Sequence, residues 1–175
     1  PIPSELGNLT SLTTLYLSSN QLSGEIPAQI TNLVNLEDGT AEDGGLDFRW
    51  NALFSHTPAV TAFLDQKQRQ GNWWSTQTIA PENVSVGVIG DQSVSLSWDA
   101  IAYEADSGGY EVYYRLAGGG TWTSGGWTPS KSEVTFPVTS LSPGTSYDFT
   151  ITSFTHPHIN NENLLTSDFS SIVSA

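Results

Sequence analysis

The stretch Leu141-Ser-Pro-Gly-Thr-Ser-Tyr147, followed by Asp148-Phe-Thr-Ile-Thr152, decides the fold of the C-terminal half of the chain. Its Pro-Gly pair predicts a turn, because proline presets φ and glycine permits a positive φ. Every second residue from Tyr147 to Ile151 is then apolar, which is the spacing of a half-buried strand. A tyrosine that opens a strand just after such a turn predicts a tyrosine corner, in which the hydroxyl bonds back to the upstream backbone.

The same period of two continues through the region from Pro81 to the end of the chain. Strands are expected over residues 84–86, 94–98, 110–114, 134–138, 147–151 and 169–173. With Trp98, the run Tyr110-Glu-Val-Tyr-Tyr-Arg115 and the tyrosine corner, this region closely resembles a fibronectin type III domain. The resemblance implies an all-β, immunoglobulin-like sandwich, which we assign to residues 79–175.

An internal repeat begins at the start of the chain. Ile2-Pro3 recurs as Ile26-Pro27, a step of 24 residues, and such self-similarity is typical of a solenoid. The segment Leu12-Thr-Thr-Leu-Tyr-Leu-Ser-Ser-Asn-Gln-Leu22 has regularly spaced leucines and one asparagine. It resembles a leucine-rich repeat. The following Leu22-Ser-Gly-Glu-Ile-Pro27 resembles the 24-residue class familiar from plant receptor kinases and also found in bacterial surface proteins. The resemblance implies that alternate leucines point into the core from a short strand.

A second copy of the repeat follows after an insertion. Leu46-Asp-Phe-Arg-Trp-Asn-Ala-Leu53 has the same strand and asparagine pattern, so Asn20 and Asn51 are expected to close equivalent turns. The strand at Leu46 should therefore lie parallel to the strand at Leu15, one repeat apart. The extra residues, within 37–45, are expected to loop out, as insertions in solenoids do.

A helix and two tryptophans are expected to close the end of the solenoid. Thr57 can act as the N-cap of a helix that starts with proline, and the polar run Gln66–Gln70 is expected to end it. Trp73 and Trp74 are expected to cover the open edge of the last repeat. Residues 1–78 thus resemble the C-terminal repeats and cap of a bacterial-type leucine-rich repeat protein. The expected fold class is a leucine-rich repeat solenoid end with a helical cap, followed by the all-β sandwich.

The composition restricts the partners that the chain can have. It contains 5 basic and 18 acidic residues, and the resulting net charge of −13 argues against binding to nucleic acid or anionic membranes. Cysteine is absent, which excludes disulfides and thiolate zinc sites. No signal peptide or apolar run of about 20 residues occurs, so no membrane contact is expected. We interpret the chain as a fragment whose export signal, if there is one, lies upstream.

Residues with catalytic or metal-binding chemistry are few. No nucleophile stands beside a base, so no catalytic residue is assigned. The pair in His156-Pro-His158 has chelating spacing but lacks a close carboxylate, and a solvated loop is favoured over a metal site. The same interpretation is favoured over calcium binding for the acidic side chains of the insertion, Glu37, Asp38, Glu42 and Asp43. No cofactor and no metal are expected.

The candidate binding residues lie on the expected strands of the repeats. Residues between the core leucines of a leucine-rich repeat face its concave surface, which places Tyr16 beside Asp47, with Arg49 following and Trp50 at the rim. Tyrosine, tryptophan and arginine are enriched at binding hot spots. The alternative, that these strands merely face solvent, is equally compatible with the sequence. In the second domain only isolated exposed aromatic residues such as Trp127 are expected.

The function expected from these features is recognition. We expect a non-enzymatic, extracellular or cell-surface recognition or adhesion protein, in which the solenoid binds a protein or glycan ligand and the sandwich acts as a spacer. Two alternatives remain open. One is an accessory module of a secreted polysaccharide-degrading enzyme, and the other is the ectodomain of a receptor.

Overall fold

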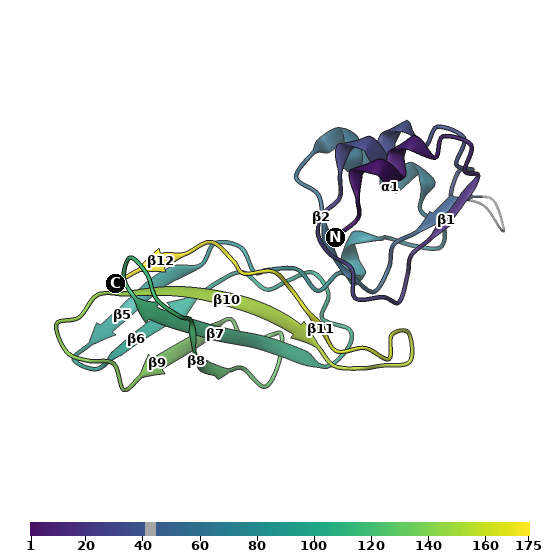
Figure 1. Ribbon diagram of the computed structural model, residues 1–175. Helices are drawn as coiled ribbons and strands as arrows, with labels where there is room; N and C mark the ends of the chain where they lie inside the picture. Colours follow the sequence, from purple (N-terminus) through teal and green to yellow (C-terminus); the bar gives the residue numbers. More distant parts are fainter. Residues whose placement is uncertain (41–44) are drawn as a thin grey trace. The chain divides into compact units, whose positions relative to one another are not determined.

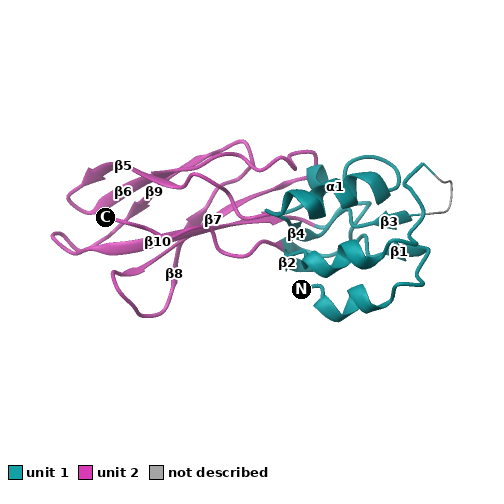
Figure 2. Ribbon diagram, turned by 90° about the horizontal axis from the view of Figure 1, so that it is seen from above, with its two compact units in different colours: residues 1–78, 157–165 teal, residues 79–156, 166–175 magenta. Residues whose placement is uncertain are grey.

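The computed structural model describes residues 1–40 and 45–175, which form two compact units (Figures 1 and 2). Unit 1 comprises Pro1–Thr78 and Pro157–Leu165, and unit 2 comprises Ile79–His156 and Thr166–Ala175. Residues 157–165 were expected in the second domain, whereas in the structure they group with unit 1. The reason is local hydrogen bonding, because Asn161 Nδ2 donates to the backbone oxygens of Asn20 (3.0 Å) and Trp50 (2.9 Å).

The described part of unit 1 consists of short strands, short 3-10 helices and an α-helix. In chain order these are η1 (Ser4–Asn8), β1 (Thr14–Tyr16), β2 (Ser23–Glu25), η2 (Ala28–Asn32), β3 (Gly45–Asp47), β4 (Ala52–Phe54), α1 (Pro58–Lys67) and η3 (Trp74–Thr76). Strand β1 pairs in parallel with β3, and Leu15 lies opposite Leu46. Strand β2 pairs in parallel with β4. The predicted parallel pairing one repeat apart is therefore confirmed.

The repeated apolar positions build the core of unit 1. Its buried members are Ile2, Ile26, Ile30, Leu33, Leu36, Leu46, Phe48, Leu53, Val60, Leu64 and Trp73. Leu15 is only partly buried and packs against this core. Trp73 joins the core as expected, but Trp74 is exposed, so the expectation that both tryptophans cover the edge is wrong for Trp74.

Helix α1 starts as predicted and ends at Lys67, within the polar run Gln66–Gln70 that was expected to end it. Thr57 occupies the N-cap position without a side-chain hydrogen bond, and its own N–H donates to Ser55 Oγ (3.2 Å). After Lys67 the chain becomes extended. Arg69 N–H donates to Leu46 O (2.9 Å), so the residues after the helix run beside β3 and do not form a loose helix end. This extended segment adds a third parallel row to the β1–β3 pair.

Unit 2 is a sandwich of two antiparallel sheets. The strands are β5 (Ser85–Gly90), β6 (Ser93–Ser97), β7 (Gly108–Leu116), β8 (Thr123–Trp127), β9 (Thr135–Thr139), β10 (Tyr147–Thr155), β11 (Leu165–Thr166) and β12 (Val173–Ser174). One sheet has the order β5-β6-β9, and the other has the order β11-β10-β7-β8 with β12 also on β10 (Figure 1).

Two strand predictions for the sandwich need correction. Strand β8 was not predicted, because Gly125-Gly126 interrupts any alternation of apolar and polar residues. Gly126 has a φ of 123°, and a Cβ there would meet the Phe136 ring at 2.6 Å, so this strand requires glycine. The last strand, expected over 169–173, is replaced by the short pieces β11 and β12.

The tyrosine corner predicted at Tyr147 is present. Ser142 N–H donates to the Tyr147 hydroxyl (3.1 Å), and the ring is buried.

Tyr147→Phe is expected to lower the free energy of unfolding of unit 2 by about 1 kcal/mol, since an N–H loses its acceptor at a site that solvent partly reaches. Urea titration measures the loss. Tyr114→Phe is the control, because its ring packs 5.9 Å from that of Tyr147 and no hydroxyl bond to a described residue is seen. Equal losses in the two variants would contradict the corner.

Candidate functional site

A polar and aromatic surface lies along the parallel strands of unit 1. We call it the strand-face patch and define it as Tyr16, Asp47, Arg49, Trp50 and Arg69. Tyr16 lies opposite Asp47 in the β1–β3 register, as the sequence analysis predicted. Backbone bonds extend this pairing, because Leu17 N–H donates to Asp47 O (2.8 Å) and Ser19 N–H donates to Arg49 O (3.0 Å).

Asp47 is a buried residue that positions Arg49 and does not form part of the exposed surface of the patch. Only 6% of the residue is exposed, contrary to the expectation that it faces a ligand. Its Oδ2 accepts from Arg49 Nη2 at 2.6 Å, while Oδ1 accepts from Arg49 Nε at 2.9 Å and from Gln68 Nε2 at 3.2 Å. Burial by itself raises the pKa of Asp47, but these hydrogen bonds outweigh it and hold the pKa below its ordinary value. Asp47 thus stays ionised and fixes the Arg49 guanidinium.

Arg49 and Trp50 form an arginine–aromatic pair. The guanidinium carbon of Arg49 lies 4.5 Å from the centroid of the Trp50 ring, and its Nη1 donates to Gln70 O at 2.8 Å. Trp50 has a φ of 54°, and its N–H donates to Thr76 Oγ1 at 3.2 Å. The tight turn therefore holds the half-buried ring against the arginine.

Tyr16 and Arg69 form a second pair, which the sequence analysis missed. Tyr16 is 46% exposed, and the guanidinium carbon of Arg69 lies 4.8 Å from the centroid of its ring. Arg69 reaches this position because the chain leaves α1 in an extended conformation beside Leu46. The run Gln66–Gln70 predicts a polar helix end, and nothing in it indicates that one arginine returns to the strands.

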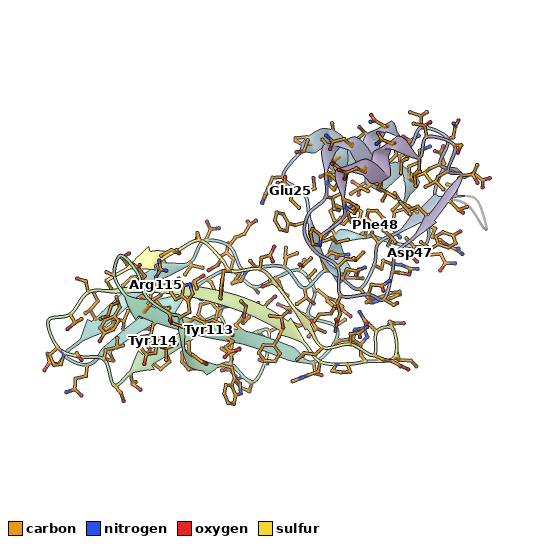
Figure 3. All side chains as sticks on the ribbon, viewed as in Figure 1. Glu25, Asp47, Phe48, Tyr113, Tyr114 and Arg115 are labelled. Carbon is orange, nitrogen blue, oxygen red and sulfur yellow. The ribbon has the colours of Figure 1, made fainter. Side chains whose placement is uncertain are left out.

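Asn51 braces the turn that presents the patch. Its side chain is fully buried, its Oδ1 accepts from Leu22 N–H at 3.0 Å, and its Nδ2 donates to three backbone oxygens. These belong to Leu17 (2.9 Å), Phe48 (3.2 Å) and Arg49 (3.2 Å). The expected role of this asparagine in closing the turn is confirmed. Figure 3 marks Asp47 and Phe48 on this part of the chain.

Unit 2 carries an aromatic cluster where only isolated residues were expected. The Phe169 ring lies 5.3 Å from that of Tyr113 and 5.9 Å from that of Trp122, and the Arg115 guanidinium carbon lies 4.3 Å from the Trp122 ring centroid. Burial and hydrogen bonding to Glu111 raise the pKa of Tyr113 to about 12. Figure 3 labels Tyr113, Tyr114 and Arg115 on β7. The cluster uses alternate residues of a strand, but Phe169 joins it from a distant segment.

The acidic residues of the insertion were considered as metal ligands, and the structure describes part of them. Asp38 of the acidic insertion pairs with Lys67 Nζ at 2.7 Å, whereas Glu42 and Asp43 lie outside the described residues. Over residues 1–40 and 45–175 no group of three or more His, Asp or Glu side chains is placed to hold a metal ion. Within the same ranges no helix has both the length and the apolar character needed to span a bilayer.

One curated relative matches the repeat region. The chain is 58% identical over 38 residues to the LRR receptor-like serine/threonine-protein kinase GSO2 of Arabidopsis thaliana. The match covers 21% of this chain and only 3% of the length of that protein. The expectation of a non-enzymatic protein is corrected by this finding, because the matched relative is named a kinase. Kinase activity is not shown for this chain, since the matched residues are a short leucine-rich stretch.

Several solved structures are similar to a little more than half of the chain. A myokine structure is 18% identical and covers 57% of this chain and 96% of its own, with a TM-score of 0.45. The FN1–FN3 domains of chicken CNTN1 are 22% identical and cover 56% of this chain and 31% of theirs, also with a TM-score of 0.45. The fn3 domain of human contactin 1 is 19% identical, covers 55% of this chain and 74% of its own, and has a TM-score of 0.44.

Two family models match separate parts of the chain. The model of the Leucine Rich Repeat matches residues 11–33, which contain β1 and β2. The model of the Fibronectin type III domain matches residues 79–162, which contain the strands from β5 to β10 and the tyrosine corner. The chain therefore contains a leucine-rich repeat followed by a fibronectin type III domain with a β-sandwich fold.

Proposed function

We propose that this chain belongs to an extracellular or cell-surface recognition protein. In this proposal the strand-face patch of unit 1 binds a protein or glycan ligand, and the sandwich of unit 2 acts as a spacer. The combination of a leucine-rich repeat with a fibronectin type III domain fits an extracellular, receptor-like or recognition protein. The proposal treats α1 and Trp73, which join the core of unit 1, as the cap of a longer solenoid. The likeness to bacterial proteins stays a prediction.

The observation that carries the proposal is the paired arrangement of arginine and aromatic side chains. Tyr16 with Arg69 and Trp50 with Arg49 give two such pairs on neighbouring rows of the strand-face patch. The chain has only three arginines among its 5 basic residues, and two of them lie here. Aromatic and arginine side chains are the residues that most often dominate binding energy. An acidic protein that concentrates its arginines on one small patch fits a ligand with sugar rings or acidic groups.

The relative named above favours one form of this proposal. GSO2 is named a receptor-like kinase, and its match falls on a short leucine-rich stretch of this chain. The second candidate function is therefore the ligand-binding ectodomain of a receptor. It uses the same patch and differs from the first candidate in what the rest of the protein does.

Tyr16→Ala is expected to weaken ligand binding at least tenfold, because it removes the exposed ring and the arginine contact together. The measurement is affinity for the ligands that the wild-type chain selects from a glycan array and from an array of secreted proteins. Arg69→Ala should weaken the same interactions. Arg49→Ala is less suitable as a test, because it leaves the buried Asp47 carboxylate without its ion-pair partner.

Trp127→Ala is the matched control for this test. Trp127 is 66% exposed on β8 and lies outside the strand-face patch, so binding is expected to be unchanged. Loss of binding in Trp127→Ala with full binding in Tyr16→Ala would overturn the assignment. Recognition would then lie on the sandwich, as expected for the accessory module of a polysaccharide-degrading enzyme.

A further inference from the structure

Residues 157–163 of unit 1 form a short hairpin, which we call the tip hairpin. His158 N–H donates to Asn161 O at 2.8 Å, and Asn161 N–H donates to His158 O at 3.1 Å. These two bonds close a turn whose central residues are Ile159 and Asn160. Asn160 N–H also donates to His158 Nδ1 at 3.3 Å, so the turn is held by bonds of its own.

A buried asparagine fastens the tip hairpin to the turns of the repeats. Asn161 is only 2% exposed, and its Nδ2 donates to Asn20 O at 3.0 Å and to Trp50 O at 2.9 Å. Ser19 Oγ donates to Asn160 O at 2.6 Å. Because Trp50 belongs to the strand-face patch, the hairpin continues that surface in a fixed position.

Ile159, in the turn of the tip hairpin, contributes almost nothing to the stability of the fold. The residue is 98% exposed, so its side chain buries hardly any apolar surface. Turns favour glycine, proline, asparagine, aspartate and serine, each for a physical reason that does not apply to a β-branched aliphatic residue. Proteins depart from such local preferences mainly at functional sites. Single exposed aliphatic residues are common, and what distinguishes Ile159 is its place on a fixed turn that adjoins a candidate binding surface.

A hollow of about 280 Å³ lies beside this turn and is lined by Ser19 and by residues 159–163. Among the residues that the structure describes, the side chains of Asn160 and Glu162 have no hydrogen-bond partner. A carboxamide can donate to a peptide carbonyl and accept from a peptide N–H, as an added strand requires. The Glu162 carboxylate favours a basic side chain in the same ligand. The hollow therefore combines an apolar tip with polar groups that suit a peptide.

We propose that the tip hairpin is a second contact element for the ligand of the strand-face patch, and that this ligand is a protein and not a glycan. A peptide segment of the ligand lies in the hollow, one of its apolar side chains covers Ile159, and a basic side chain pairs with Glu162. An aliphatic residue offers no hydrogen bond to sugar hydroxyls, whereas an apolar protein side chain can bury it. The inference rests on the proposed function, because one ligand is taken to contact both elements.

The test uses the proteins that the wild-type chain selects from an array of secreted proteins. Ile159→Ser is expected to weaken binding to them at least fivefold with an unchanged melting temperature, because the side chain makes almost no contact within the chain. Glu162→Gln should also weaken binding, by a factor that falls as the salt concentration rises. Wild-type affinity in Ile159→Ser, or a chain that selects glycans and no protein, would overturn the proposal.

Two further variants make the result specific. Val34 is an aliphatic residue of unit 1 that is 68% exposed and lies outside the tip hairpin and the hollow, so Val34→Ser should leave binding unchanged. Equal losses in Val34→Ser and Ile159→Ser would contradict a specific contact. Tyr16→Ala separates this inference from the proposed function. Loss in Tyr16→Ala with full binding in Ile159→Ser would refute the tip hairpin alone, and the reverse pattern would refute the strand-face patch.

Discussion

Asn51→Ala is expected to lower the free energy of unfolding of unit 1 by about 3 kcal/mol. The buried side chain provides one acceptor and one amide group that together serve four backbone partners. Leu22 N–H loses its acceptor outright, whereas Phe48 O keeps a bond from Gln77 Nε2 at 2.8 Å. A partly buried donor without its acceptor, together with three lost bonds from a fully buried amide, explains a loss of this size. Urea unfolding followed through NMR signals of Leu46 and Leu53 measures it.

The chain provides its own control for this variant. Asn20 occupies the equivalent position of the preceding repeat, and its Nδ2 donates to Leu17 O (3.2 Å) and Ser18 O (2.9 Å). Because Asn20 is exposed, water replaces these bonds, and Asn20→Ala should cost less than about 1 kcal/mol. Equal losses for the two substitutions would show that burial of the asparagine is not what stabilises the turn.

The stability of unit 2 is expected to rise by about 2 kcal/mol between pH 8 and pH 10. Burial lowers the pKa of Lys131 to about 8 in the folded state, whereas its pKa is 10.5 in the unfolded chain. Within this window the unfolded state binds more protons, so raising the pH favours the folded state. Above pH 10 the rise should stop, because burial raises the pKa of Tyr110 and Tyr113 and the unfolded tyrosines ionise first. Guanidinium titrations across pH 7–10.5 measure the dependence.

Lys131→Met assigns this rise to one residue. Methionine fills a similar volume without a charge to desolvate, so the variant should be more stable than wild type by about 2 kcal/mol at pH 7. Its stability should also be flat between pH 8 and pH 10. A variant that keeps the pH-dependent rise would show that another group releases the proton.

The sandwich was the part of the fold most accessible from sequence. Alternation along Tyr147–Ile151 and the Pro-Gly turn are local signals that predict the strand and its corner. The alternation also predicts a half-buried strand, and this is wrong, because the polar residues Asp148 and Thr150 are buried as well. The parallel pairing of Leu15 with Leu46 was also predictable, because a repeat fixes the register once its period is known. Strand β8 was not, since Gly126 is required by contact with Phe136, a residue of another strand.

The candidate site was only partly predictable, for a related reason. Tyr16 and Asp47 were placed as neighbours by the repeat, but the burial of Asp47 depends on Gln68, which returns from the end of α1. Arg69 reaches Tyr16 by the same return. Lys131 stands in the sequence as a single lysine between serines, and it is buried against Tyr103, a residue of a separate segment. Contacts of this kind come from tertiary packing and leave no local pattern.

Hydrogen–deuterium exchange of the chain with and without its selected ligand tests the central claim most directly. If the strand-face patch binds the ligand, added protection should fall on β1 and on the segment from β3 to Trp50. Exchange in β7 and β8 of the sandwich should stay unchanged. Protection confined to β7 and β8, with β1 and β3 exchanging as in the unbound chain, would contradict the assignment of recognition to unit 1.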